Sequence, residues 1–387
     1  EDQAIIGNPE TKRDLKVTFL MNISGVNIEF TKDLVYKFNS PEYGETFRPL
    51  EIVPAFSVKV KEPVYIFASD QTKDIKVSVY AWAKDLKGTL SVPVPQGWKV
   101  TPESVDFSIT NKGEHKDFTF SITPPDITQE VFITPKVTAG DEIFTSEIKD
   151  INYDHIPFQT VVMTSETKLS RIGIEVRGQR IAYLMGAGDE IPVSLRQIGY
   201  SVDEIKSDEI SLEMLIKYDA LIVGVRAYNT DEKLKFKQKD IFEYVKQGGN
   251  VIIQYNTANG LVTKELAPYP LTLSRNRVTV EEAEMRILQP NHSIMNYPNK
   301  ITSIDFEGWV QERGLYFPGE WDSKFTPVFS CNDPGEKPQD GSVLVAQHGD
   351  GHYIYTGLSF FRQLPAGVSG AFRLFANMIS IGQDAQP

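Results

Sequence analysis

The stretch that decides the fold is Arg180-Ile181-Ala182-Tyr183-Leu184-Met185-Gly186-Ala187-Gly188, an apolar run that ends in a glycine turn. Two similar apolar runs follow, at residues 220–225 and 250–255. Segments with helical spacing of apolar residues lie between and after these runs, at residues 191–199, 212–217, 234–248 and 370–381. Strands that alternate with helices are typical of a parallel, doubly wound sheet. We therefore predict an α/β domain of the flavodoxin-like type at residues 170–387.

The glycine turn at 186–188 does not have the pattern of a nucleotide-binding loop. It lacks the third glycine of a dinucleotide fingerprint and the Lys-Ser/Thr pair of a phosphate-binding loop. Glycine tolerates the backbone angles of a tight turn, so a turn is the favoured interpretation.

The first part of the chain has a different pattern. Short segments of β-branched and aromatic residues alternate with polar ones, and Pro, Gly and Asn separate them, as in residues 17–21 and 26–30 around Ser24-Gly25. This spacing of strands is typical of antiparallel sandwiches. We expect a partial or small β module at residues 1–60 and a β-sandwich of immunoglobulin-like type at residues 61–165.

Length and charge narrow the class of protein. With 387 residues the chain exceeds what one hydrophobic core usually serves, which predicts a multi-domain protein. The net charge of -12 repels phosphate backbones, so we expect no nucleic-acid partner. No apolar window is long enough to span a bilayer, and the first residues show no signal peptide. The single cysteine, Cys331, excludes internal disulfides and cysteine-rich zinc sites.

Several motifs resemble the C-terminal region of bacterial PIG-L (LmbE-like) family deacetylases, where a class I glutamine amidotransferase-like domain follows the deacetylase domain. The main carriers are Tyr183-Leu184-Met185-Gly186-Ala187-Gly188-Asp189, Ser194-Leu195-Arg196-Gln197-Ile198-Gly199-Tyr200 and Gly224-Val225-Arg226-Ala227-Tyr228-Asn229. The others are Gln254-Tyr255-Asn256-Thr257, Glu307-Gly308-Trp309-Val310-Gln311-Glu312-Arg313, Tyr355-Thr356-Gly357 and Tyr153-Asp154-His155-Ile156-Pro157. The sandwich resembles the NEW3-type module of carbohydrate-active enzymes. The resemblance implies an exported protein, periplasmic or at the cell surface, with a deacetylase domain upstream in the same polypeptide.

Two departures from this family bear on activity. The His-Pro-Asp-Asp run that ligates zinc in the deacetylase is absent. Class I amidotransferases also place a cysteine on a strand-to-helix elbow, but the turn after residues 251–253 reads Gln254-Tyr255-Asn256-Thr257, without a thiol. We therefore predict no catalytic residue, no metal and no cofactor in this chain. Cys331 is expected to be an incidental loop residue, and His348 and His352 to flank a hairpin turn.

The loops after the predicted parallel strands supply the first set of candidate ligand-binding residues. Ligands of doubly wound sheets bind at the carboxyl edge. Arg226 offers a planar donor fork, and carboxylates and amides accept from hydroxyl groups. The candidates at this edge are Asp189, Arg226, Asn229, Tyr255 and Asn256. The competing interpretation is structural, with Asp189 and Asn229 as helix caps and Arg226 in an ion pair.

A second set of candidates lies in the aromatic and charged segment at residues 306–317. Here Trp309 and Tyr316, with Trp321 just after the segment, could stack on sugar rings while Glu307, Glu312 and Arg313 bind hydroxyl groups. The competing interpretation is a buried aromatic core with an ion pair at its rim.

These observations favour a non-catalytic accessory region of a PIG-L-type deacetylase, which binds a glycan or small polar ligand and organises domains. Two alternatives remain open. One is a hydrolase, an amidase or glycosidase, that uses a non-cysteine group such as Asp189 or Glu312. The other is a purely structural spacer.

Overall fold

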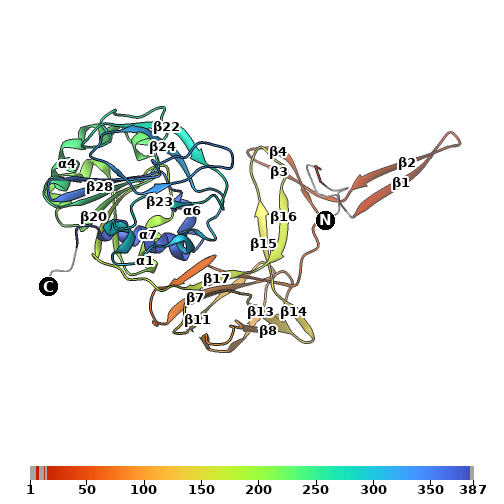
Figure 1. The fold of residues 1–387 in the computed structure, drawn as a ribbon. Helices are drawn as coiled ribbons and strands as arrows, with labels where there is room; N and C mark the ends of the chain where they lie inside the picture. The colour runs from red at the N-terminus through yellow and green to blue at the C-terminus, as the bar shows by residue number, and fades with distance from the viewer. Residues whose placement is uncertain (1–5, 8–12, 14, 384–387) are drawn as a thin grey trace.

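The computed structural model describes residues 6–7, 13 and 15–383, and it shows a multi-domain, β-rich chain (Figure 1). Projecting hairpins, a β-sandwich and an α/β domain follow one another along the molecule. The hairpins are separate two-stranded sheets.

The sandwich consists of two four-stranded sheets around one apolar core. The first sheet has the order β5-β7-β11-β9 and the second has the order β10-β8-β13-β14. Their strands are β5 (Phe56–Val60), β7 (Lys73–Ala81), β8 (Leu86–Ser91), β9 (Lys99–Thr101), β10 (Ser104–Ile109), β11 (His115–Thr123), β13 (Lys136–Ala139) and β14 (Glu142–Phe144). Val77 and Phe120 of the first sheet meet Leu90 and Val137 of the second in this core, because their inward positions alternate with polar ones.

One boundary differs from the sequence prediction. We had placed residues 56–60 in the first module, but β5 pairs with β7 in the sandwich, Val58 beside Val79. The reason is that Phe56, Val58 and Val60 are buried in the sandwich core.

A three-stranded sheet joins the sandwich to the α/β domain. Its order is β12-β17-β6, with β6 (Val64–Phe67), β12 (Gln129–Ile133) and β17 (Thr167–Arg171). Ile66 of β6 is buried in the core of the α/β domain, and its amide donates to the side chain of Gln197 at 2.7 Å. Lys73 Nζ donates to the Gln197 carbonyl at 2.7 Å, and Lys168 Nζ donates to the Gly367 carbonyl at 3.1 Å. The two domains are therefore linked by buried apolar contact and by specific hydrogen bonds.

The α/β domain is built on a seven-stranded sheet with the order β19-β18-β20-β21-β28-β27-β25. The first five strands are parallel and the last two run antiparallel to their neighbours. The strands are β18 (Arg180–Leu184), β19 (Ser201–Ile205), β20 (Ala220–Val223), β21 (Asn250–Ile253), β25 (Thr326–Pro327), β27 (Val343–His348) and β28 (Gly351–Thr356). The apolar runs at 180–185, 220–225 and 250–255 are thus confirmed as neighbouring strands.

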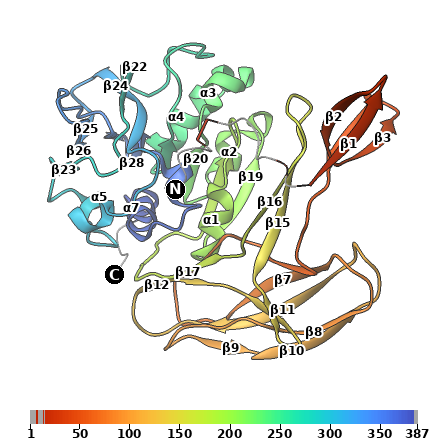
Figure 2. The ribbon, with the colours of Figure 1, turned by 90° about the vertical axis from the view of Figure 1, so that its right-hand side faces the viewer.

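Helices cover both faces of this sheet, as Figure 2 shows. One face packs against α1 (Ile191–Gln197), α5 (Ser293–Asn296) and α7 (Ser369–Ser380), and the other packs against α2 (Leu212–Leu215), α3 (Ala227–Thr230) and α4 (Gln238–Lys246). The remaining elements are η1 (Ser207–Glu209), η2 (Glu232–Phe236), η3 (Ser303–Phe306), α6 (Phe360–Gln363), β22 (Leu271–Val278) paired with β24 (Gly314–Trp321), and β23 (Arg286–Ile287) paired with β26 (Phe329–Ser330). Cover on both sides explains why the central strands are continuously apolar.

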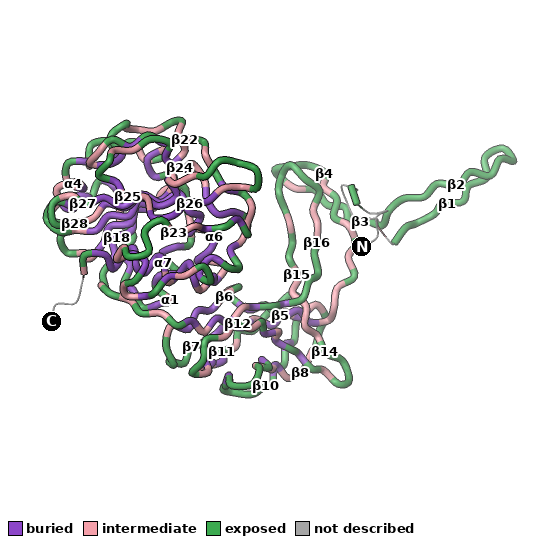
Figure 3. Tube along the Cα trace, viewed as in Figure 1, coloured by how far each residue is buried: buried purple, intermediate pink, exposed green. Residues whose placement is uncertain are grey.

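The projecting hairpins have little cover (Figure 3). They are β1 (Lys16–Ile23) with β2 (Val26–Asp33), β3 (Val35–Ser40) with β4 (Gly44–Pro49), and β15 (Ser146–Ile151) with β16 (Gln159–Thr164). Arg48 of β4 joins two of them, since it pairs with Asp150 at 3.2 Å and lies over the ring of Phe158. In the described part of the chain, no helix has the length and apolarity that crossing a membrane requires.

Candidate functional site

A tight strand-to-helix turn of the α/β domain follows β20. Its first residue is Gly224, and Arg226 adopts a left-handed backbone with φ of 57° just before α3. We had placed the elbow of the amidotransferase resemblance after β21, at Gln254-Tyr255-Asn256-Thr257. In the structure β21 leads into a loop rather than into a helix, so the elbow of this sheet carries an arginine.

Close approach between two loops fixes the shape of this elbow. A Cβ atom on Gly224 would lie 2.9 Å from the carbonyl oxygen of Leu184, and one on Gly186 would collide with the carbonyl oxygen of Val225. Ala187 donates its amide to the same Val225 carbonyl at 2.8 Å. The glycine turn after β18 thus serves backbone packing against the elbow, which agrees with its interpretation as a tight turn.

Arg226 connects the elbow to the loop after β21. Its amide donates to the Tyr255 carbonyl at 2.8 Å, while its side chain is exposed. The guanidinium has no hydrogen bond or ion pair to any residue that the structure describes. An arginine stays protonated and cannot act as a nucleophile, so this elbow presents a fixed positive charge.

Tyr255 lies at the centre of an aromatic cluster at the carboxyl edge. Its ring is stacked with that of Tyr316 at a centroid distance of 6.2 Å and an interplanar angle of 8°. The Phe361 ring lies 5.3 Å away on a tilted plane. Burial raises the pKa of Tyr255, and the charges of Arg226 and Arg362 oppose this shift. The cluster therefore combines an apolar wall with nearby cations.

Two of the predicted site residues hold the loops of this edge together. The side chain of Asn256 is fully buried and accepts from the Tyr228 amide at 2.9 Å. Asn229 donates to the carbonyls of Thr257 and Asn259, both at 3.1 Å, and accepts from the Thr257 amide at 2.8 Å. Their polar atoms are occupied by backbone groups. Asn229 is not the helix cap that we predicted, because it lies within α3 and binds the loop after β21 instead.

Asp189 belongs to a buried network behind the edge. Both of its carboxylate oxygens lie 2.7 Å from the Tyr183 hydroxyl, and one accepts from the Ile191 amide at 3.1 Å. Gln254 donates to the same hydroxyl at 2.8 Å. Burial raises the pKa of Asp189, against the effect of these hydrogen bonds. The carboxylate thus ties the loop before α1 to its first residue, but it is not the helix cap that we predicted, because the N-cap position is occupied by Glu190.

A hollow opens beside the aromatic cluster, with a volume of about 370 Å³, which is within the range of small-molecule sites. It lies between the loop after β21 and strands β22 and β24, and it is lined by Thr257, Asn259, Arg275, Arg277, Leu315 and Tyr316. Our sequence reasoning identified Tyr316 as a candidate for stacking on a sugar ring, but it missed Arg275 and Arg277. The only signal was an Arg-Asn-Arg triplet, and nothing in it indicates that β22 pairs with β24 beside this loop.

Backbone strain gathers around the same edge. Arg226, Gln311 and Tyr316 have φ angles of 57°, 67° and 50°, a region that non-glycine residues rarely adopt. Tyr316 stacks on Tyr255, and Gln311 accepts a hydrogen bond from Arg362, whose charge reaches Tyr255. Strained residues cluster at binding sites more often than elsewhere, so this edge is the best candidate for a functional site.

The second predicted set, at residues 306–317, divides into core and rim. Trp309 is 3% exposed and donates to the Asp305 carbonyl at 3.0 Å, so its ring has little surface left for a sugar. Arg313 is 4% exposed and donates to the carbonyls of Ala283 and Phe306. Glu312 pairs with Arg362 at 2.6 Å. From this segment, Tyr316 belongs to the Tyr255 cluster, and the charges of the Glu312–Arg362 pair reach it.

Glu307 lies instead on the rim of a separate hollow of about 770 Å³. Three further glutamates, Glu281, Glu282 and Glu284, line the same hollow over an apolar floor. One of them, Glu281, accepts from the Gln311 amide at 2.6 Å. No group of histidine, cysteine and acidic side chains among the described residues has the arrangement of a metal site.

Cys331 is remote from chemistry of the amidotransferase type. It is fully buried, and burial raises the pKa of its thiol to about 12. Its charged neighbours are arginines and Asp333, with no histidine among them. We had expected an incidental loop residue, and the structure places it in the apolar core, where a thiol is inert.

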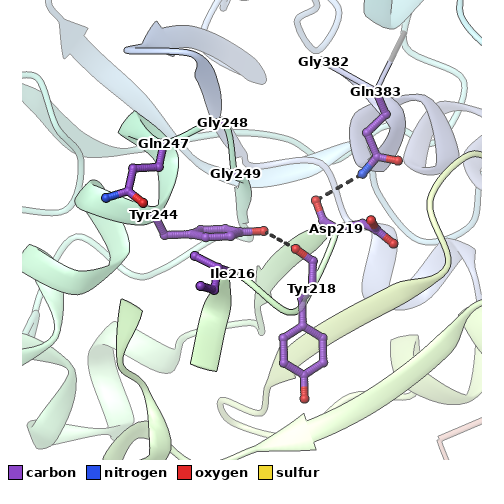
Figure 4. Close-up of a pocket in the computed structure, with 9 residues that line it drawn as sticks. All are labelled: Ile216, Tyr218, Asp219, Tyr244, Gln247, Gly248, Gly249, Gly382 and Gln383. Atoms are coloured by element: carbon purple, nitrogen blue, oxygen red, sulfur yellow. Dashed lines mark hydrogen bonds between the residues drawn. The ribbon is translucent and has the colours of Figure 1, made fainter. Parts of the chain in front are cut away.

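Another hollow lies at the opposite, amino edge of the sheet (Figure 4). Its volume is about 490 Å³, and Tyr218, Asp219, Tyr244 and Gln383 line it. Tyr244 donates to the Tyr218 carbonyl at 3.0 Å, and Asp219 accepts from the backbone amides that begin β18. These polar groups fasten chain segments to each other, and the carboxyl edge therefore remains the stronger candidate.

Comparisons with known proteins give no family. No family model and no curated protein matches the chain. Among solved structures, a family 123 glycoside hydrolase from Clostridium perfringens has 7% identity and a TM-score of 0.20, over 58% of this chain and 42% of that one. E. coli alpha-2-macroglobulin has 9% identity and a TM-score of 0.21, over 40% of this chain and 10% of its own. The Reelin-N domain of F-spondin has 15% identity and a TM-score of 0.18, over 29% of this chain and 86% of its own. These scores are too low to carry an argument about function.

Proposed function

We propose that this chain is a non-catalytic binding region that receives a glycan or another small polar ligand at the carboxyl edge of its parallel sheet. The observation that carries the proposal is the hollow of about 370 Å³ beside Tyr316. An aromatic side chain, two arginines and the polar side chains of Thr257 and Asn259 converge there. Hydroxyl-bearing ligands are recognised by a few polar groups of this kind on an apolar wall.

The elbow supports a role in binding rather than in catalysis. The residue that it presents is Arg226, whose side chain can donate hydrogen bonds but cannot attack a carbonyl carbon. The carboxylates that a hydrolase would need already have partners, since Asp189 is held by Tyr183 and Glu312 by Arg362. Both groups would have to give up these partners before they could act on a substrate.

The family context is part of the proposal. The order β19-β18-β20-β21-β28, in which the second strand lies outside the first, supports the proposal of a flavodoxin-like domain. With the motifs described above, this order supports an amidotransferase-like domain behind a NEW3-type sandwich, in the C-terminal region of an exported PIG-L-type deacetylase. The reading frame upstream of Glu1 tests this part, because a His-Pro-Asp-Asp segment belongs there.

A glycan array followed by titration calorimetry tests the binding function. We expect the wild-type chain to retain a defined subset of glycans, and Tyr316→Ala to weaken binding about tenfold or more, as the loss of an aromatic contact does. Alanine tolerates the left-handed backbone no worse than tyrosine, so the fold is expected to persist. Tyr36→Ala, an exposed tyrosine of β3, is the matched control. If the wild-type chain retains no glycan and no small polar ligand, the binding function is refuted.

A further inference from the structure

The arginines of the α/β domain fall into two groups. From Arg171 to Arg373, all but three donate to a carboxylate, a side-chain oxygen or a backbone carbonyl. The exceptions are Arg226, Arg275 and Arg277, whose side chains have no hydrogen bond or ion pair to any residue that the structure describes. These three exposed arginines occupy one edge of the sheet.

The positions of these three residues converge on the Tyr255 cluster. Arg275 and Arg277 line the hollow together with Tyr316, and Tyr316 stacks on Tyr255. Arg226 approaches Tyr255 from the elbow, through its backbone hydrogen bond and through its charge. Two of these arginines thus line the hollow beside the aromatic pair, and the charge of the third reaches Tyr255 from the elbow.

Acidic groups near this edge are already committed. Glu312, whose charge reaches Tyr255, is paired with Arg362 at 2.6 Å. Asp333, which the charge of Arg277 reaches, accepts from the Thr279 amide and the Val280 amide, each at 2.9 Å, and from the Thr279 hydroxyl at 2.8 Å. The chain as a whole is acidic, with a net charge of -12, whereas this edge carries an excess of positive charge from arginines without ion pairs.

Rigid backbone supports the cluster of charges. Arg275 and Arg277 flank Asn276, whose side chain donates to the Gln339 side chain at 2.7 Å and whose backbone amide donates to the Ser274 hydroxyl at 2.9 Å. The Ser274 hydroxyl donates to the Phe317 carbonyl at 2.7 Å and ties β22 to β24. The two guanidinium groups are therefore carried by a fixed strand pair rather than by a free loop.

We infer that the ligand of this edge is an acidic sugar, whose carboxylate, sulfate or phosphate group binds to Arg226, Arg275 and Arg277. The inference rests on the proposed function and names its ligand class. Guanidinium groups bind such anions through paired hydrogen bonds, and Tyr316 provides a surface for the sugar ring. Thr257 and Asn259 line the same hollow, where their polar side chains are available for the hydroxyl groups of such a sugar.

The test uses the full chain and matched probes. Oligosaccharides with uronic acid, sulfate or phosphate groups are compared with their neutral counterparts, and inorganic phosphate and sulfate are titrated alone. We expect acidic oligosaccharides to bind at least about tenfold more tightly than the neutral ones, with affinity falling as salt rises. Arg275→Gln combined with Arg277→Gln removes this preference. Arg180→Gln, an exposed arginine at the opposite edge, is the control for loss of charge.

The outcomes separate the inference from the proposed function. Equal binding of neutral and acidic oligosaccharides overturns the inference and leaves the proposed function standing. Unchanged binding of acidic sugars by the double variant also overturns it. If phosphate or sulfate alone binds as tightly as the best acidic oligosaccharide, the ligand is a free anion, and the inference of an acidic sugar is refuted. Absence of binding by every probe refutes both.

Discussion

Strands β21 and β2 are both rich in β-branched residues, and their surroundings are opposite. Every residue of β21 is buried between helices on either face of its sheet, whereas every residue of β2 is exposed. In the β1–β2 hairpin, the apolar residues other than Leu20 lie on one face, with Phe19 beside Phe30 and Met21 beside Ile28. The comparison teaches that alternation of apolar residues specifies a strand, while burial depends on whether another element covers it.

The largest expected effect sharpens this contrast through matched truncations. Ile252→Ala removes buried methyl groups from β21 and is expected to lower the free energy of unfolding by about 2–5 kcal/mol. Ile28→Ala, in the exposed hairpin, is expected to change it by less than about 0.5 kcal/mol. Urea denaturation followed by circular dichroism measures both. Equal losses would show that the hairpin face is covered in solution.

A smaller effect concerns pH and the buried network of the α/β domain. Burial raises the pKa of Asp189, so the folded chain takes up this proton more readily than the unfolded chain does. Wild-type stability therefore gains from this group as the pH falls through the raised pKa. Asparagine keeps the acceptor for Tyr183 and lacks the titration. We expect the free energy of unfolding of Asp189→Asn to lie within about 1 kcal/mol of the wild-type value at pH 7. As the pH is lowered towards 4, we expect the variant to become less stable relative to wild type. Thermal denaturation of both proteins at several pH values measures this difference in stability. A difference that does not change with pH would contradict the prediction.

The smallest effect on stability is expected in the hairpin itself. Phe19→Ser combined with Ile28→Ser replaces two apolar side chains that are 49% and 42% exposed. We expect a melting temperature within about 1 °C of wild type, since little buried surface is lost. Binding of a hydrophobic fluorescent dye, in contrast, should fall clearly, because exposed apolar faces bind such dyes. Val58→Ser, a buried residue of the sandwich, is the contrasting control. Unchanged dye binding by the hairpin variant would mean that its apolar face is not the accessible one.

The same contrast explains how much of the fold could be predicted from the sequence. The apolar runs that became β18, β20 and β21 were recognisable because a covered strand needs apolar residues on both faces. The β1–β2 hairpin was recognisable from its alternation and from Ser24-Gly25. What alternation does not specify is that β5 leaves the first module and joins the sandwich.

The candidate site was predictable only in part, for a different reason. Arg226 and Tyr255 follow predicted strands, and parallel topology brings such residues to one edge. Arg275 and Tyr316 come to the same place through the pairing of β22 with β24, two strands separated by more than thirty positions along the chain. Pairing of this kind depends on tertiary packing, which no local pattern records. Trp309 shows the converse, because an aromatic residue beside charges looks like a binding residue in sequence and is a core residue in space.

The hydrogen bond from the Arg226 amide to the Tyr255 carbonyl has a consequence for how a ligand would be received. Together with the Asn229 contacts to the backbone of residues 257 and 259, it fixes two loops before any ligand arrives. Association then costs little conformational entropy in the protein, and the free and bound forms should superimpose closely. The edge is therefore a pre-organised binding site. Its selectivity is expected to come from the shape and charge of the ligand rather than from closure of loops around it.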